Sequence, residues 1–164
     1  IRDRVNAHKD KKQVFVIGNG GSAADAQHIA CELVGKFKFE RKPYPAIALT
    51  TNTSILTAIS NDIGFEEVFA RQIQALATEK DLVIGISTSG QSINVIKGIS
   101  AAKNKRAKTA VLTGKKGEKL AKLADISLIV PSDNTPRIQE AHITVGHIIC
   151  EMIERLLTSE EEPK

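Results

Sequence analysis

Short apolar runs alternate with amphipathic stretches along most of the chain. Apolar runs of strand length, most of them rich in β-branched residues, predict five strands, at Gln13–Ile17, Ala46–Leu49, Leu82–Ile86, Thr109–Leu112 and Ile126–Val130. Apolar residues at helical spacing predict helices over Ser22–Lys36, Ser54–Ser60, Glu66–Ala77, Ser92–Asn104, Glu118–Leu123 and Thr135–Leu157, with a break at Asn61–Gly64. Buried strands that alternate with helices are typical of a parallel sheet covered on both faces. We therefore expect a doubly wound, flavodoxin-like three-layer α/β/α sandwich with a five-stranded parallel sheet.

Three loops follow predicted strands at the edge of the sheet where ligands bind. Sheets of this kind hold their ligands outside the carboxyl ends of the strands. The rule selects Gly18–Ser22, Thr50–Ser54 and Ser87–Ser92. Ser22 and Asp25 stand at capping-box spacing, which predicts that the first helix begins at Ser22.

Length and composition exclude several classes of protein. The 164 residues suit a single domain, and no apolar run approaches the roughly 20 residues of a membrane span. The two cysteines, Cys31 and Cys150, form neither a CxxC pair nor a disulfide framework, so we expect a reduced, cytoplasmic protein.

The net charge of +4 comes partly from a basic stretch, Lys103–Lys122, with eight Lys or Arg and one acid. Such a stretch favours either an anionic partner, such as nucleic acid, or a solvated lysine-rich face. The stretch has no aromatic residue to stack bases, and we prefer the solvated face. We expect neither a nucleic-acid partner nor membrane association.

The first glycine loop fits a nucleotide motif only in part. Gly18, Gly20 and Ala23 match G-x-G-x-x-[GA] between a strand and a helix. The dinucleotide fingerprint also requires an acid at the end of the second strand, where Leu49–Asn52 has none. A tight turn without a ligand is a second interpretation. We favour a third, in which the backbone amides of the loop face a small polar ligand.

The serine-rich loop has the parts of a phosphate cradle. Ser87–Ser92 holds four hydroxyls in six residues and opens a predicted helix. Neutral donors beside the positive end of a helix dipole bind phosphate without a cation in the loop. An ordinary helix cap needs only one hydroxyl, so the phosphate interpretation is preferred.

Two predicted helices carry groups that could do acid–base or metal chemistry. His28 and Glu32 are spaced i, i+4 and share one helix face. The last helix adds Gln139, Glu140, His142 and His147. Together these groups could hold zinc or transfer protons, although an i, i+4 pair alone is often a surface contact. Spacing does not choose between His142 and His147.

Four blocks of sequence carry a family resemblance. Gly18–Phe37, Ala46–Gln72, Gly85–Ser92 and Arg137–Glu154 resemble the phosphoheptose isomerases (sedoheptulose 7-phosphate isomerases) of the sugar-isomerase (SIS) domain superfamily. The similarity extends over about residues 12–157 and implies one SIS domain over residues 1–164. The implied reaction converts D-sedoheptulose 7-phosphate to D-glycero-D-manno-heptose 7-phosphate through an enediol(ate), which supplies heptose for lipopolysaccharide.

The resemblance also implies roles for individual residues. Glu32 and His147 would be the catalytic acid and base. One zinc ion per subunit would be held by His28, Glu32, Gln139 and His147, which selects His147 over His142. The substrate contacts would be Asn19, Gly20, Gly21, Glu32, Asn61, Asp62, Ser87, Thr88, Ser89, Ser92 and Gln139, with the serine loop on the phosphate. The family is a homotetramer with active sites at subunit interfaces, an arrangement that would let helices from different chains bring His28 and Glu32 to Gln139 and His147.

The chain departs from the family pattern in places. Lys36 stands where the family often has Arg, Pro136 stands where some members have Asp, and only a stub of an N-terminal helix, Ile1–Asn6, is expected. A related, non-catalytic protein binds the replication initiator DnaA and lacks the catalytic Glu and second His that are present here as Glu32 and His147. That binding function, and an SIS isomerase of another phosphosugar, are the alternatives.

Overall fold

The fold is a five-stranded parallel sheet between two layers of helices. The structure is a computed structural model that describes residues 12–161, and the expected stub Ile1–Asn6 lies outside them. The sheet has the order β2-β1-β3-β4-β5, which is the flavodoxin-like order, so the predicted fold class is confirmed. The strands are β1 (Val14–Gly18), β2 (Ala46–Ala48), β3 (Leu82–Ser87), β4 (Lys108–Gly114) and β5 (Ile126–Val130).

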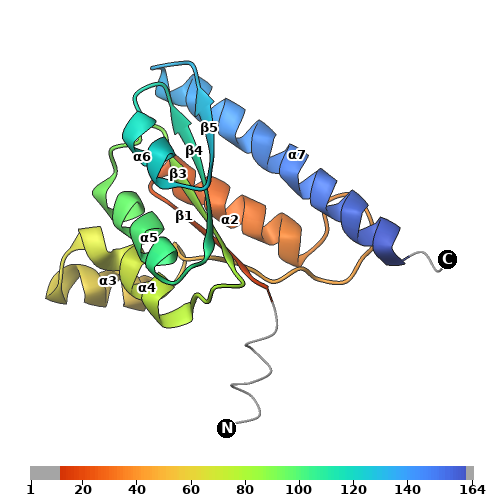
Figure 1. Cartoon of the computed structure of the whole chain (residues 1–164), viewed down its shortest axis with the longest axis horizontal. Helices are drawn as coiled ribbons and strands as arrows, with labels where there is room; N and C mark the ends of the chain where they lie inside the picture. The colour runs from red at the N-terminus through yellow and green to blue at the C-terminus, as the bar shows by residue number, and fades with distance from the viewer. Residues whose placement is uncertain (1–11, 162–164) are drawn as a thin grey trace, which may run out of the picture.

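The helices divide between the two faces of the sheet (Figure 1). One face carries α2 (Gly21–Val34) and α7 (Thr135–Glu161). The other face carries α3 (Thr53–Asp62), the short 3₁₀ helix η1 (Phe65–Glu67), α4 (Val68–Leu76), α5 (Ile93–Asn104) and α6 (Glu118–Leu123). No helix within residues 12–161 is both long enough and apolar enough to cross a membrane.

Strand β1 supplies both halves of the core, because successive side chains of a strand point to opposite faces. Phe15 and Ile17 are buried in the cluster that includes residues of α4 and α5. Val14 and Val16 are buried in the other cluster, with Ile29 of α2 and residues of α7. This double burial explains why the strand appears in the sequence as a continuous apolar run.

Two local expectations differ from the structure. The predicted capping box is wrong: α2 begins at Gly21, its N-cap is Gly20 with φ 54°, and no side chain caps it. Glycine adopts this positive φ readily, so the chain turns into the helix before Ser22, which is buried in the first turn. Helix α3 also continues through Asn61 and Asp62 instead of ending before them.

Candidate active site

Strands β1 and β3 are neighbours, so the glycine loop and the serine loop start side by side at the carboxyl edge of the sheet. Gly18, at the end of β1, is in register with Ile86 of β3. The side-chain amides of Asn19 and Asn94 exchange two hydrogen bonds of 2.8 Å, and this pair joins the glycine loop to the first turn of α5. The predicted ligand edge therefore contains both loops.

The serine loop is a compact group of hydroxyls at the start of α5. The hydroxyls of Ser87 and Ser92 lie 3.0 Å apart, and the Gly90 amide donates to Ser87 Oγ at 3.1 Å. The loop fits closely against the loop after β4, since a Cβ on Gly90 would lie 2.1 Å from the backbone of Gly117. Ser92 is the N-cap of the twelve-residue helix α5, and its side chain makes no capping hydrogen bond. These donors can face a phosphate group.

Helices α2 and α7 bring together residues from the two ends of the chain. His28 Nε2 lies 2.9 Å from His147 Nε2 and 3.3 Å from Glu32 Oε1. His147 therefore already meets His28 and Glu32 within a single chain. One chain is sufficient, because α7 returns after β5 to the face of the sheet that α2 covers.

Gln139 lies on the same helix as His147 but nearer the start of α7. It precedes His147 by two turns of α7, which is a rise of about 12 Å. Its amide contacts the start of α2, where a Cβ on Gly21 would lie 2.2 Å from Gln139 Nε2. Within one chain, Gln139 is therefore beside the glycine loop and not beside His28.

The side chains of this cluster are of the types that bind zinc, but their spacing in the structure is not that of a metal site. Two imidazoles and a carboxylate, His28, His147 and Glu32, are donors that zinc prefers. Their spacing is that of a hydrogen-bonded cluster, since two nitrogens on one tetrahedral zinc lie about 3.3 Å apart. Within residues 12–161 no group of three or more His, Cys, Asp or Glu side chains is arranged to hold a metal ion.

Two further titratable groups lie near this helix pair. Asp25, one turn before His28 on α2, has a pKa raised by burial, an effect that the nearby His28 partly offsets, and its Oδ2 is buried without a hydrogen-bond partner. Sequence reasoning considered Asp25 only as a cap and missed its place on the His28 face, which the i, i+3 spacing could have indicated. His142 is 1% exposed, and burial lowers its pKa. The structure therefore places His142 in the interior, whereas His147 contacts His28 in the cluster.

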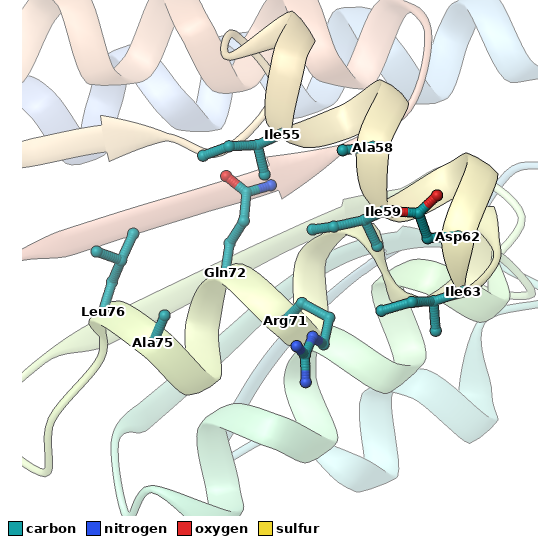
Figure 2. Close-up of a pocket in the computed structure, with 9 residues that line it drawn as sticks. All are labelled: Ile55, Ala58, Ile59, Asp62, Ile63, Arg71, Gln72, Ala75 and Leu76. Atoms are coloured by element: carbon teal, nitrogen blue, oxygen red, sulfur yellow. The ribbon is translucent and has the colours of Figure 1, made fainter.

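Asn61 and Asp62 lie away from the histidine cluster, in the last turn of α3 on the opposite face of the sheet. Both are exposed, and the Asn61 amide donates to Asp62 at 2.8 Å. Asp62 borders a groove of about 460 Å³ between α3 and α4, whose walls Figure 2 shows to be largely aliphatic. Besides Asp62, the polar side chains that line this groove are those of Arg71 and Gln72.

Comparison with known proteins places this fold and these loops in a defined class. The fold and its carboxyl-edge loops define an SIS domain, and the family model described as "SIS domain" matches residues 3–114. Phosphoheptose isomerase from Aquifex aeolicus is 58% identical over 151 residues, which are 92% of this chain and 79% of that protein. The enzyme of the same name from Nitratiruptor sp. is 56% identical over 92% of this chain and 80% of its own length.

Solved structures of phosphoheptose isomerases are also similar to this chain. Phosphoheptose isomerase from Neisseria gonorrhoeae is similar with a TM-score of 0.83 and 42% identity, over 94% of this chain and 86% of that chain. The structure of a phosphoheptose isomerase from Francisella tularensis gives a TM-score of 0.85 and 39% identity, over 94% and 82%. The chain belongs to the phosphoheptose isomerase family.

Proposed function

We propose that this chain is an aldose–ketose isomerase that converts D-sedoheptulose 7-phosphate to D-glycero-D-manno-heptose 7-phosphate. The observation that carries the proposal is the contact of His147 on α7 with His28 on α2, beside Glu32. It places an imidazole and a carboxylate, the usual proton-transfer groups, within one cluster. Relatives named for this activity, at 54–58% identity, support the same reaction.

The reaction moves a proton between neighbouring carbons of the sugar. In the proposed roles, His147 removes a proton from C1 of the ketose, which leaves an enediolate across C1 and C2. The protonated base, after exchange with solvent, delivers a proton to C2, and Glu32 serves the two oxygens as their protons exchange. Glu32 has a side chain only 19% exposed, so its carboxyl is partly shielded from water. Two groups with different environments can divide acid and base work in this way.

The phosphate of the substrate is assigned to the serine loop. Ser87, Thr88, Ser89 and Ser92 offer hydroxyls around the start of α5, and Asn19, Gly20 and Gly21 would contact the sugar from the neighbouring loop. Holding the phosphate fixes the distance from the loop to the reacting carbons. Binding energy at this remote group then orients the reacting end of the sugar.

Zinc binding is a further part of the proposal. His28, Glu32 and His147 would hold the ion, and Gln139 would join only by a contribution from another chain. A bound zinc ion supplies Lewis-acid polarisation of a sugar oxygen. Metal analysis of purified wild-type protein and of His28→Ala tests this. Equal zinc content in the two proteins would contradict the ligand assignment.

We also propose a homotetramer with active sites at subunit interfaces. Its support is that Gln139, Asn61 and Asp62 lie away from the histidine cluster of their own chain.

The free cysteines Cys31 and Cys150 support a reducing, cytoplasmic location. The product of the proposed reaction would serve heptose supply for lipopolysaccharide.

Incubation of the purified chain with sedoheptulose 7-phosphate tests the function. We expect a heptose 7-phosphate with an aldehyde carbon, followed by NMR. Glu32→Gln should abolish turnover, because it removes the proton-transfer group and keeps the shape. Glu118→Gln, which removes an exposed carboxylate of an i, i+4 pair on α6, is the control and should react at the wild-type rate. Normal turnover by Glu32→Gln would overturn the assignment.

A further inference from the structure

The loop that follows α2, residues 35–41, passes close to α7 (Figure 1). One buried carboxylate of α7 holds it there. Glu154 is fully buried, and its Oε1 accepts from the Phe37 amide at 2.6 Å. Its Oε2 accepts from the amides of Lys38 at 2.7 Å and of Phe39 at 3.1 Å. Three consecutive backbone amides are thus fixed by one side chain of α7.

Arg41 anchors the same loop to the end of α2. Its Nε donates to Glu154 Oε1 at 3.0 Å, and its side chain is 2% exposed. Its Nη2 donates to the carbonyl oxygen of Glu32 at 2.7 Å, and Nη1 donates to that of Leu33 at 2.9 Å. A cation at the carbonyl end of a helix is favourable. The loop is therefore tied at both helices of the candidate site.

The anchored loop places an aromatic ring on His147. The rings of Phe37 and His147 are stacked, with centroids 5.4 Å apart and an interplanar angle of 27°. His147 and Glu154 are spaced i, i+7, so they share one face of α7 two turns apart. A loop fixed at Glu154 can therefore lie along that face and cover the His147 ring, while His147 Nε2 faces His28.

We propose that Phe37 is a positioning residue for this reaction: its ring fixes the orientation of the His147 imidazole, and Glu154 with Arg41 fixes Phe37. This inference rests on the proposed function, in which His147 is the base. An imidazole that can rotate presents its nitrogen to the substrate carbon for only part of the time. Misplacement of a reacting group lowers the rate of chemistry more than it weakens substrate binding.

Three variants test the role. Phe37→Leu keeps an apolar side chain and removes the ring, so we expect kcat to fall about tenfold with KM within about twofold of wild type. Phe37→Tyr keeps the ring and should restore kcat. Phe39→Leu is the matched control: Phe39 lies two residues further along the loop, is 38% exposed, and its ring contacts Arg155. It should behave as wild type.

A second measurement does not depend on turnover. In the metal-free protein, the nuclear Overhauser contacts between the ring protons of His147, assigned by their loss in His147→Gln, and the ring protons of His28 should weaken in Phe37→Leu and persist in Phe39→Leu. Wild-type kcat in Phe37→Leu, or unchanged Overhauser contacts between His147 and His28, would overturn the inference. If the wild-type chain converts no heptose phosphate, the proposed function fails, and the NMR comparison still decides whether Phe37 orients His147.

Discussion

Removal of the buried Glu154 carboxylate should destabilise the protein more than removal of an exposed charged group does. In Glu154→Ala, three backbone amides and the buried Arg41 guanidinium lose their common acceptor. Breaking a buried ion pair from one side costs about 3 kcal/mol or more, because the other charge stays buried without compensation. For a chain of this size, about 1 kcal/mol corresponds to a shift in melting temperature of roughly 2–4 °C. We therefore expect a melting temperature lower by roughly 6–12 °C.

Thermal unfolding followed by circular dichroism measures this effect. Glu151→Ala is the control, because Glu151 lies one turn earlier on α7 and pairs with Lys38 and Arg155 at the surface. It should melt close to wild type, since surface pairs contribute little. If Glu154→Ala also melted within about 2 °C of wild type, the buried carboxylate would not hold the loop as described.

The same carboxylate predicts a dependence on pH. Burial alone would raise the pKa of Glu154, but the three backbone amides and Arg41 outweigh burial, and its pKa lies below the ordinary value. A carboxyl with a lowered pKa in the folded state stabilises the protein above its unfolded pKa. This stabilisation is lost as pH falls through the folded pKa. The difference in stability between wild type and Glu154→Ala should therefore be full at neutral pH and shrink in acid; a constant difference would contradict the assignment.

Three further predictions concern the loops and the thiols. Ser87→Ala with Ser89→Ala should raise KM strongly, because two candidate phosphate donors are lost; an unchanged KM in steady-state assays would remove the loop from this role. Gly90→Ala should lower the melting temperature, because Gly90 has φ 64° and its Cβ would meet the next loop; a wild-type melting temperature would contradict the close fit. Burial raises the pKa of the Cys150 thiol to about 11, whereas Cys31 is exposed, so iodoacetamide should label native protein at Cys31 alone by mass spectrometry; modification of Cys150 would contradict its burial.

The sequence predicted the elements whose signals are local. Ile126–Val130 and Glu118–Leu123 have the predicted bounds, because a β-branched run and a short amphipathic run mark them directly. Helix α2 begins one residue before the predicted Ser22, because a glycine with positive φ, and not a side-chain cap, sets its start. The phosphate role of Ser87–Ser92 stays a prediction, and the structure gives it a compact loop at the start of α5.

The parts of the site that depend on tertiary contacts could not be predicted in the same way. The helical spacing of His28 and Glu32 is visible in the sequence, but their approach to His147 follows from the packing of α7 beside α2. Phe37 belongs to a loop without a recognisable motif, and the chain brings it to His147 only because Glu154 accepts the loop amides. Contacts of this kind between distant segments carry no periodic signal.

The most direct test of the central claim, proton transfer by the α2–α7 cluster, is the reaction of sedoheptulose 7-phosphate with the wild-type chain in D₂O. A protein base that takes the C1 proton exchanges it with solvent, so NMR should find deuterium at C2 of the heptose 7-phosphate product. A product that carries only hydrogen at C2 would contradict a protein base that exchanges its proton with solvent, and the absence of any heptose product would contradict the function itself.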